Sequence, residues 1–334
     1  MCAPICAGKS WDEVATCSPL QATSQLYTFV AREGLETGGY FDWSAACYQL
    51  VEELDDEWQG YGEFNKPQQK KARKWVENAL AAQPGFLEGG LALAQMQHDA
   101  GEAESSVTLD RFIRQADAQM PKGFKGRITW GHLGNRCYHR MLWLRLKMHQ
   151  DGGDLKAASR LARKQLKLNP NDNLGIRFVL PLLLLTQGEY VAAKRATKGL
   201  TGDEGLTAAA IRAFCEHALG NRAAFRRELA DALISLPWLR VFLLNQSKPL
   251  TDGDDGFRGV QPDLEAFLEF AWPAYAAVPG LRDACRSFLA EPRVLRAEAE
   301  LRLYWKGYWG RGGGRVGSLE GWRALSAKAR REIA

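Results

Sequence analysis

Two histidines and two arginines near the middle of the chain are the residues best suited to chemistry. They are separated by three, four and seven positions, so a helix would bring them onto one face: His132, Arg136, His139 and Arg140. Such a face can bind an anion or a phosphate group, and a histidine can act as a general acid or base. Neither a paired carboxylate nor a plausible nucleophile accompanies them. An enzyme acting on a phosphorylated substrate is therefore the third-ranked hypothesis, and a solvent-facing or salt-bridged helix start is the simpler interpretation.

A series of basic residues between positions 160 and 212 could recognise an acidic partner. Arginine offers a planar fork that makes bidentate contacts with carboxylates. If these side chains line a groove, they would bind an acidic peptide or a carboxylate terminus, whereas on ordinary exposed helix faces they would only contact solvent. The candidate partner-binding residues are Arg160, Arg163, Arg177, Lys194, Arg195, Lys198 and Arg212, with Lys164 beside them.

Aromatic and cationic residues are interleaved near the C-terminus, and glycines follow them. Such a segment can stack on bases while it neutralises phosphates, as in the binding of single-stranded RNA. Alternatively, the aromatic residues cover the last apolar face of a helical array, or they contact a partner protein. The candidate residues are Tyr304, Trp305, Lys306, Tyr308, Trp309, Arg311 and Arg315.

Other kinds of site lack their sequence signals. The seven cysteines form no CxxC pair and the five histidines form no HxxxH pair, so we expect no metal site and no cofactor. Scattered cysteines and an N-terminus without a secretory leader indicate free thiols in a cytoplasmic protein. The longest apolar run, Phe178 to Leu185, is too short to span a bilayer, so we expect no membrane partner.

Helical periodicity dominates the chain, and strand signals are rare. Between residues 68 and 83, for example, apolar side chains recur at spacings of three and four. A glycine followed by a residue that can cap a helix recurs at Gly153, Gly188 and Gly220, at intervals of 35 and 32 residues. The glycine can end one helix in the left-handed conformation, and the next residue can begin a second helix. A period of this length built of two antiparallel helices is typical of a helical solenoid.

One turn between helices resembles that of a known repeat family. Residues 166–173 read Leu-Lys-Leu-Asn-Pro-Asn-Asp-Asn, in which Pro170 fixes a turn and Asp172 or Asn173 can cap the next helix. This segment resembles the turn between tetratricopeptide repeats, and the resemblance covers residues 133–235. The first-helix aromatic positions of that family are mostly aliphatic here, and a proline falls inside that helix. The resemblance implies stacked helix pairs that bind other proteins through a concave groove.

The expected fold is all-α, a right-handed α-solenoid of antiparallel helix pairs with irregular helical extensions at both ends. We expect an acidic N-terminal segment at residues 1–65 and a repeat array at 66–250, clearest at 133–235. A C-terminal helical extension with a basic, aromatic and glycine-rich tail is expected at 251–334. One further helix pair is expected within residues 85–120.

The leading functional hypothesis is a non-catalytic adaptor or scaffold that binds an acidic or extended segment of a protein partner in the groove. The alternative is a nucleic-acid-associated protein that binds through its C-terminal tail. The chain is 46% hydrophobic and 25% charged with a net charge of +5, which is close to an ordinary globular protein. That composition excludes a wholly disordered chain and a small disulfide scaffold.

Overall fold

A computed structural model describes most of the chain, which divides into two compact units at residues 1–145 and 146–334. Within the described ranges, no helix is both long enough and apolar enough to cross a membrane. These ranges are 25–32, 38–58, 66–200, 205–236, 239–244, 261–309 and 318–334.

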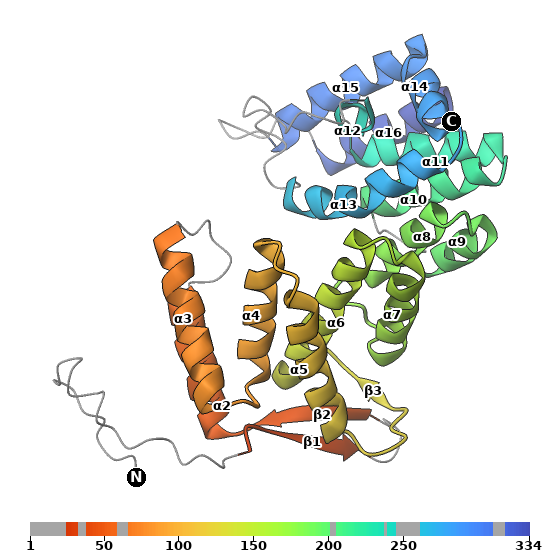
Figure 1. The fold of residues 1–334 in the computed structure, drawn as a ribbon. Coiled ribbons are helices and arrows are strands. Elements are labelled where there is room, and N and C mark those ends of the chain that lie inside the picture. The colour runs from red at the N-terminus through yellow and green to blue at the C-terminus, as the bar shows by residue number, and fades with distance from the viewer. Residues whose placement is uncertain are drawn as a thin grey trace. The chain divides into compact units, whose positions relative to one another are not determined.

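The first unit combines a small sheet with a row of helices (Figure 1). Strands β1 (Tyr27–Arg32) and β2 (Gly38–Trp43) pair antiparallel, and β3 (Arg127–Ile128) pairs parallel with β2. The helices are α2 (Ala45–Trp58), α3 (Lys66–Ala82), α4 (Leu87–Asp99), α5 (Ser105–Gln119) and α6 (Leu133–Asp151), whose last residues belong to the second unit.

The sheet is an addition to the predicted fold, which contained helices only. Tyr27 and Phe41 are buried on β1 and β2, and Phe29 lies opposite Phe41 with its ring centroid 5.1 Å away. Aromatic residues at alternate positions are suited to a pleated and half-buried surface. The strands are only six residues long, so this alternation is a weak signal beside the strong helical periodicity elsewhere.

Two glycines allow α4 to pack closely against its surroundings. A Cβ atom at Gly90 would lie 2.2 Å from the ring of Phe112 on α5, and one at Gly89 would lie 2.5 Å from the ring of Phe86. Both rings are fully buried. An aromatic ring therefore fills the space that a side chain would occupy at each glycine. At Gly90 this allows α4 to lie close to α5.

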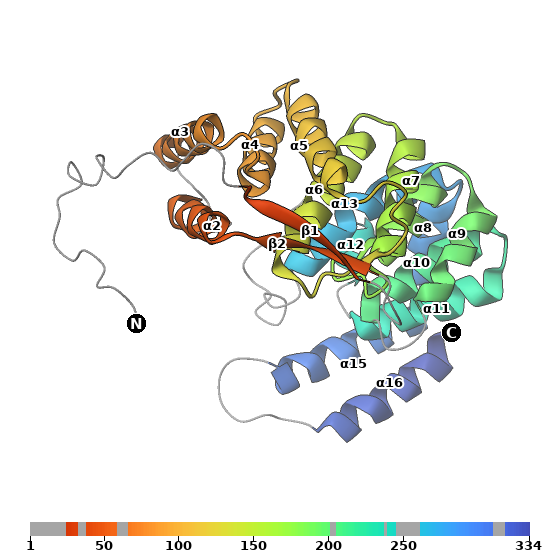
Figure 2. The same ribbon diagram turned by 90° about the horizontal axis from the view of Figure 1, so that it is seen from below.

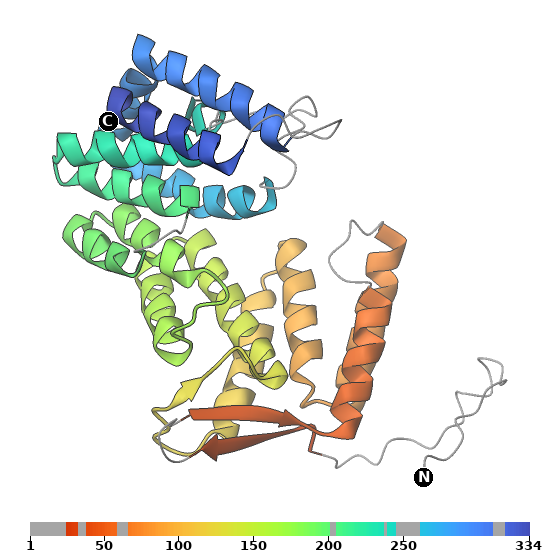
Figure 3. The same ribbon diagram turned by 180° about the vertical axis from the view of Figure 1, so that it is seen from behind.

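The second unit is entirely helical over its described residues (Figure 3). Helices α15 and α16 run side by side and antiparallel (Figure 2). The elements are α7 (Leu155–Leu168), α8 (Ile176–Thr186), α9 (Tyr190–Ala196), the 3-10 helix η1 (Thr197–Gly199), α10 (Gly205–Ala218), α11 (Arg222–Ser235), α12 (Leu239–Leu244), α13 (Gln261–Ala277), α14 (Leu281–Leu289), α15 (Pro292–Trp309) and α16 (Leu319–Ile333).

Four turns of one kind join helices into pairs. Three were predicted at the recurring glycines, and the fourth, at Gly101, was predicted within the further helix pair of residues 85–120. In each, the glycine has a φ between +70° and +77°, which a residue with a side chain rarely adopts. The next residue donates its N–H to the carbonyl five positions earlier at 2.8 to 2.9 Å, which closes the end of the first helix. The turns begin at Gly101 (α4–α5), Gly153 (α6–α7), Gly188 (α8–α9) and Gly220 (α10–α11).

The predicted cap of α8 is also confirmed. Asp172 Oδ1 accepts a hydrogen bond from the N–H of Ile176 and Oδ2 accepts one from the N–H of Arg177, both at 2.7 Å. Asp172 is buried and has a φ of +49°. Its carboxylate therefore satisfies two N–H groups at the start of α8 that have no partner within the helix.

In the second unit, α13 covers the first helices of two pairs. It packs along α8 and α10, and its Phe270, Ala274 and Tyr275 are buried there. The ring of Tyr275 lies 5.6 Å from that of Phe214 on α10, and its hydroxyl donates to the carbonyl of Leu243 at 3.0 Å. The face that α8 and α10 turn toward α13 is therefore occupied by the chain itself.

Candidate functional site

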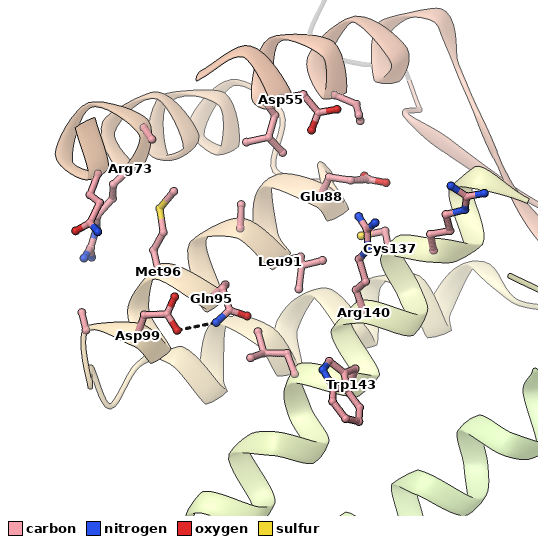
Figure 4. Close-up of a pocket in the computed structure, with 18 of the residues that line it drawn as sticks. Asp55, Arg73, Glu88, Leu91, Gln95, Met96, Asp99, Cys137, Arg140 and Trp143 are labelled. Atoms are coloured by element: carbon pink, nitrogen blue, oxygen red, sulfur yellow. Dashed lines mark hydrogen bonds between the residues drawn. The ribbon is translucent and has the colours of Figure 1, made fainter. Parts of the chain in front are cut away.

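A pocket of about 1080 Å³ lies within the first unit, between α2, α3, α4 and α6 (Figure 4). Helix α4 lines it with Glu88, Leu91 and Met96, and α6 lines it with Arg140 and Trp143. Glu88 and Arg140 lie together toward one end, and Met96 lies toward the other. Arg73 and Asp99 lie near Met96, so both ends of the pocket carry charged side chains, and Leu91 lies between them. Below, the end that carries Glu88 is called the Glu88 end and comprises Glu88, Arg136, Cys137 and Arg140.

Helix α6 is fixed to the sheet by a buried asparagine. The Oδ1 atom of Asn135 accepts the N–H of Phe41 at 3.0 Å. Its Nδ2 atom donates to the carbonyls of Thr129 at 2.8 Å and Gly39 at 3.3 Å. Because Asn135 is fully buried, these bonds are shielded from water and hold the start of α6 in one position.

The same side of α6 carries two further polar anchors. His139 is buried, and its Nε2 lies 2.6 Å from the carbonyl oxygen of Ile128 on β3. Burial lowers the pKa of His139, so the ring is neutral near pH 7 and Nε2 carries the hydrogen that it donates. Tyr138 donates its hydroxyl to Asp117 on α5 at 2.6 Å. The opposite stripe of α6, with Arg136, Arg140 and Trp143, is thereby left to line the pocket.

Arg136 and Arg140 share one aromatic platform and form no ion pair among the described residues. The Cζ atoms of Arg136 and Arg140 lie 5.6 and 5.8 Å from the ring centroid of Trp130. Arg136 is half-buried, and its Nε makes a long bond of 3.4 Å to the carbonyl of Trp130; Arg140 is exposed. Two guanidinium groups held beside one ring without an ion pair form a site for an anion.

Glu88 faces these arginines from the first turn of α4. Its Oε2 accepts the hydroxyl of Tyr27, and that hydroxyl accepts the N–H of Leu87 at 3.1 Å. Burial raises the pKa of Glu88 to about 7, against the smaller lowering effects of Tyr27, the N–H of Glu88 itself, Arg140 and the thiol of Cys137. The carboxyl group is therefore about half protonated at neutral pH.

The thiols beside Glu88 are held in the protonated form. Burial raises the pKa of Cys47 to about 12 and holds that of Cys137 well above its ordinary value. The nearby charge of Glu88 raises both further. Neither thiol is therefore an activated nucleophile. Among the described residues, no group of three or more histidine, cysteine or acidic side chains could hold a metal ion.

No family model matches the chain, and no curated protein or solved structure matches it either.

Three of the predicted partner-binding residues lie beside carboxylates of the chain itself. Arg212 Nε donates to its acidic partner at 2.7 Å and Arg177 Nε lies 4.0 Å from its partner. A partner protein would compete with these carboxylates for the same cations. The pairs are Arg177 with Asp172, Lys194 with Glu216, and Arg212 with Glu228.

The other four predicted residues are exposed and form no ion pair within the described ranges. Arg160 and Arg163 lie on α7, Arg195 lies on α9 and Lys198 lies on η1. Helices α7 and α9 are the second helices of their pairs, whereas Arg177 and Arg212 lie on first helices. The predicted series is therefore divided between two kinds of helix.

The C-terminal aromatic residues that can be placed pack inside the helical hairpin α15–α16. Tyr304 donates its hydroxyl to the carbonyl of Ser318 at 2.7 Å, and Trp305 meets Trp322 edge-on at 5.5 Å. Both residues therefore contribute to the contact between α15 and α16. Lys306, Tyr308 and Trp309 belong to the last turn of α15, and Arg311 and Arg315 lie outside the described residues.

The four residues with which the sequence analysis began are separated by the structure. Arg136 and Arg140 line the pocket, whereas His139 bonds to β3 and His132 stacks on Tyr40 at 4.5 Å. A helix brings residues three and four apart close together, but it places neighbours such as His139 and Arg140 on different sides. Glu88 was missed because a single glutamate in a helix start gives no signal of its burial.

Proposed function

We propose that the chain is a non-catalytic, helical-repeat binding protein that holds an acidic, extended segment of a protein partner in the pocket of the first unit. The observation that carries this proposal is the pair Arg136 and Arg140, which line the pocket and form no ion pair among the described residues, while the Glu88 that faces them has a pKa of about 7. The neighbouring apolar surface at Leu91, Met96 and Trp143 would receive apolar side chains of the same segment.

The charges around the pocket favour an anionic partner. Its lining includes five basic and three acidic residues. One of the acids, Glu88, has a pKa of about 7, so the lining carries a net charge of between +2 and +3 at neutral pH. The basic residues are Lys66, Lys70, Arg73, Arg136 and Arg140, and the acidic residues are Asp55, Glu88 and Asp99.

The pocket replaces the series at residues 160–212 as the favoured binding surface. In the second unit, the first helices α8 and α10 are covered by α13, and Arg177 and Arg212 already face carboxylates. In the first unit, the first helices α4 and α6 line an open pocket. The four glycine turns support a solenoid of tetratricopeptide type as the scaffold, and four buried free cysteines fit a reducing cytoplasm.

Capture on immobilised peptide libraries tests the proposal. One library carries glutamate at fixed positions within otherwise random short peptides, and its matched library carries glutamine there. We expect the purified full chain to be retained by the glutamate library, and we expect R136E/R140E to bind at least about tenfold more weakly, because two charge-assisted contacts are reversed. The pair R136Q/R140Q gives a second variant with a smaller electrostatic change.

The matched control is R160E/R163E, which reverses two exposed arginines on α7 and should bind as the wild type does. Circular dichroism verifies that each variant retains its helices. Equal capture by the glutamate and glutamine libraries would contradict the proposal. Loss of binding in R160E/R163E with retention in R136E/R140E would move the site to the originally predicted series.

A further inference from the structure

The hydrogen bonds around Glu88 determine which of its oxygens can carry a proton. The N–H of Leu87 donates to the hydroxyl oxygen of Tyr27, and Tyr27 donates its own proton to Glu88 Oε2. Oε2 is therefore already an acceptor. Oε1 is buried and has no hydrogen-bond partner among the described residues. The weak thiol donor of Cys137 and the N–H of Glu88 itself lie near the carboxyl group. A proton on Glu88 therefore lies on Oε1.

Several titratable and charged groups face Glu88, but few of them change charge near neutral pH. Tyr27 and the thiols of Cys47 and Cys137 remain protonated because burial raises the pKa of each. Arginines and lysines remain cationic. From the elements around the pocket, the facing groups are Tyr27 on β1, Cys47 and Asp55 on α2, Lys66 and Lys70 on α3, and Arg136, Cys137 and Arg140 on α6.

Arg140 connects the charge of Glu88 to an anion bound in the pocket. Its positive charge lowers the pKa of Glu88 and so favours the ionised carboxylate. An anion that binds Arg140 and Arg136 would compensate this charge and would place its own negative charge near Glu88. Both effects make the ionised form of Glu88 less favourable. Binding of an anion and protonation of Glu88 therefore assist each other.

We propose that the Glu88 end of the pocket takes up one carboxylate of the partner together with a proton, the carboxylate on Arg136 and Arg140 and the proton on Glu88 Oε1. This inference rests on the proposed function and adds the chemistry of its anchoring site. In its protonated form, Glu88 no longer competes with the ligand for Arg140. The pocket would therefore bind an acidic segment more tightly as the pH falls through neutrality.

Isothermal titration calorimetry of the full chain tests the inference, with the tightest-binding peptide of the glutamate library as the probe. In buffers of different ionisation enthalpy at pH 7, we expect an uptake of up to about half a proton per peptide, because Glu88 with a pKa of about 7 is half protonated before binding. If binding raises this pKa by one unit or more, the affinity at pH 8 should be roughly five- to tenfold weaker than at pH 6.

Two variants separate Glu88 from other groups that titrate in this range. E88Q keeps an acceptor for Tyr27 but cannot ionise, so it should show no such uptake and a nearly constant affinity between pH 6 and pH 8. E52Q changes an exposed glutamate on α2 and should keep the wild-type pH profile. Proton uptake that is the same in E88Q and in the wild type would overturn the inference and leave the proposed function standing.

If the wild type binds no peptide of the glutamate library at any pH, both the proposed function and this inference are wrong. If E88Q does not fold, a measurement on the wild type alone still tests the coupling between peptide binding and protonation of Glu88. The 13C signal of the Glu88 side-chain carboxyl should titrate at higher pH when the peptide is bound. An unchanged titration midpoint in the presence of saturating peptide would refute the coupling.

Discussion

Replacing Glu88 by glutamine should stabilise the first unit in a manner that depends on pH. The change removes a carboxyl group whose ionised form is disfavoured by burial, while glutamine can still accept the hydroxyl of Tyr27 through its side-chain carbonyl. At low pH the wild-type carboxyl is protonated in both the folded and the unfolded chain. We therefore expect the two proteins to be equally stable there.

The magnitude follows from the two pKa values of Glu88. Its ordinary value is 4.5, and in the folded chain it is raised to about 7. Between these values the folded state binds more protons than the unfolded state, so the stability contributed by the neutral carboxyl is lost as the pH rises from 4.5 to 7. The loss amounts to about 3 kcal/mol. At pH 8, E88Q should therefore be about 3 kcal/mol more stable than the wild type.

Hydrogen exchange of the α4 backbone amides, read by mass spectrometry, measures this difference in the full chain. Comparison of E88Q with the wild type at each pH cancels the intrinsic pH dependence of exchange, and E52Q serves as the control for removal of an exposed glutamate. We expect the protection of α4 in the two proteins to converge near pH 4.5 and to differ most above pH 7. A difference that stays constant from pH 4.5 to pH 8 would show that Glu88 does not titrate as the structure requires.

Two further predictions concern packing and capping. Gly90→Ala should destabilise the first unit by about 2 kcal/mol or more, because the new Cβ would lie 2.2 Å from the ring of Phe112. The control is Gly85→Ala, whose new Cβ meets no atom within 4 Å and which should change the thermal midpoint little. Asp172→Ala should lower the free energy of unfolding in denaturant titrations by about 2 kcal/mol, because two N–H groups at the start of α8 lose their acceptor. The control is Asn171→Ala, which changes the exposed neighbouring residue. Equal stability within either pair would contradict the packing or the cap described here.

The helical pairs could be predicted because their signals are local. A glycine at the end of a helix, as at Gly153 and Gly220, leaves a direct mark in the sequence, and its bonds involve residues only a few positions apart. The cap at Asp172 is local for the same reason. The residue after each recurring glycine, Asp154, Glu189 or Asn221, was predicted to cap the next helix. Only Asp154 does so with its side chain. Backbone bonds alone suffice in the other two turns.

The pocket could not be predicted because contacts over long sequence distances position the residues that line it. Tyr27 and Glu88 are 61 positions apart, and Asn135 bonds to residues of β2 more than 90 positions earlier. Nothing in the local sequence distinguishes Glu88 from an exposed glutamate. The basic series from Arg160 to Arg212 is visible in the sequence as a local pattern. In the structure it is divided between the first and second helices of the pairs, and some of its members form ion pairs with acids that are distant in the sequence.

Photo-crosslinking tests most directly the claim that the pocket of the first unit is the binding surface. A glutamate-library peptide that carries a benzophenone group is irradiated with the full chain, and the modified residues are located by mass spectrometry. We expect crosslinks to pocket residues on α4 and α6, such as Met96 and Trp143, and we expect an excess of unlabelled peptide to suppress them. Crosslinks concentrated on α7 and α9, around Arg160 and Arg195, would contradict this claim.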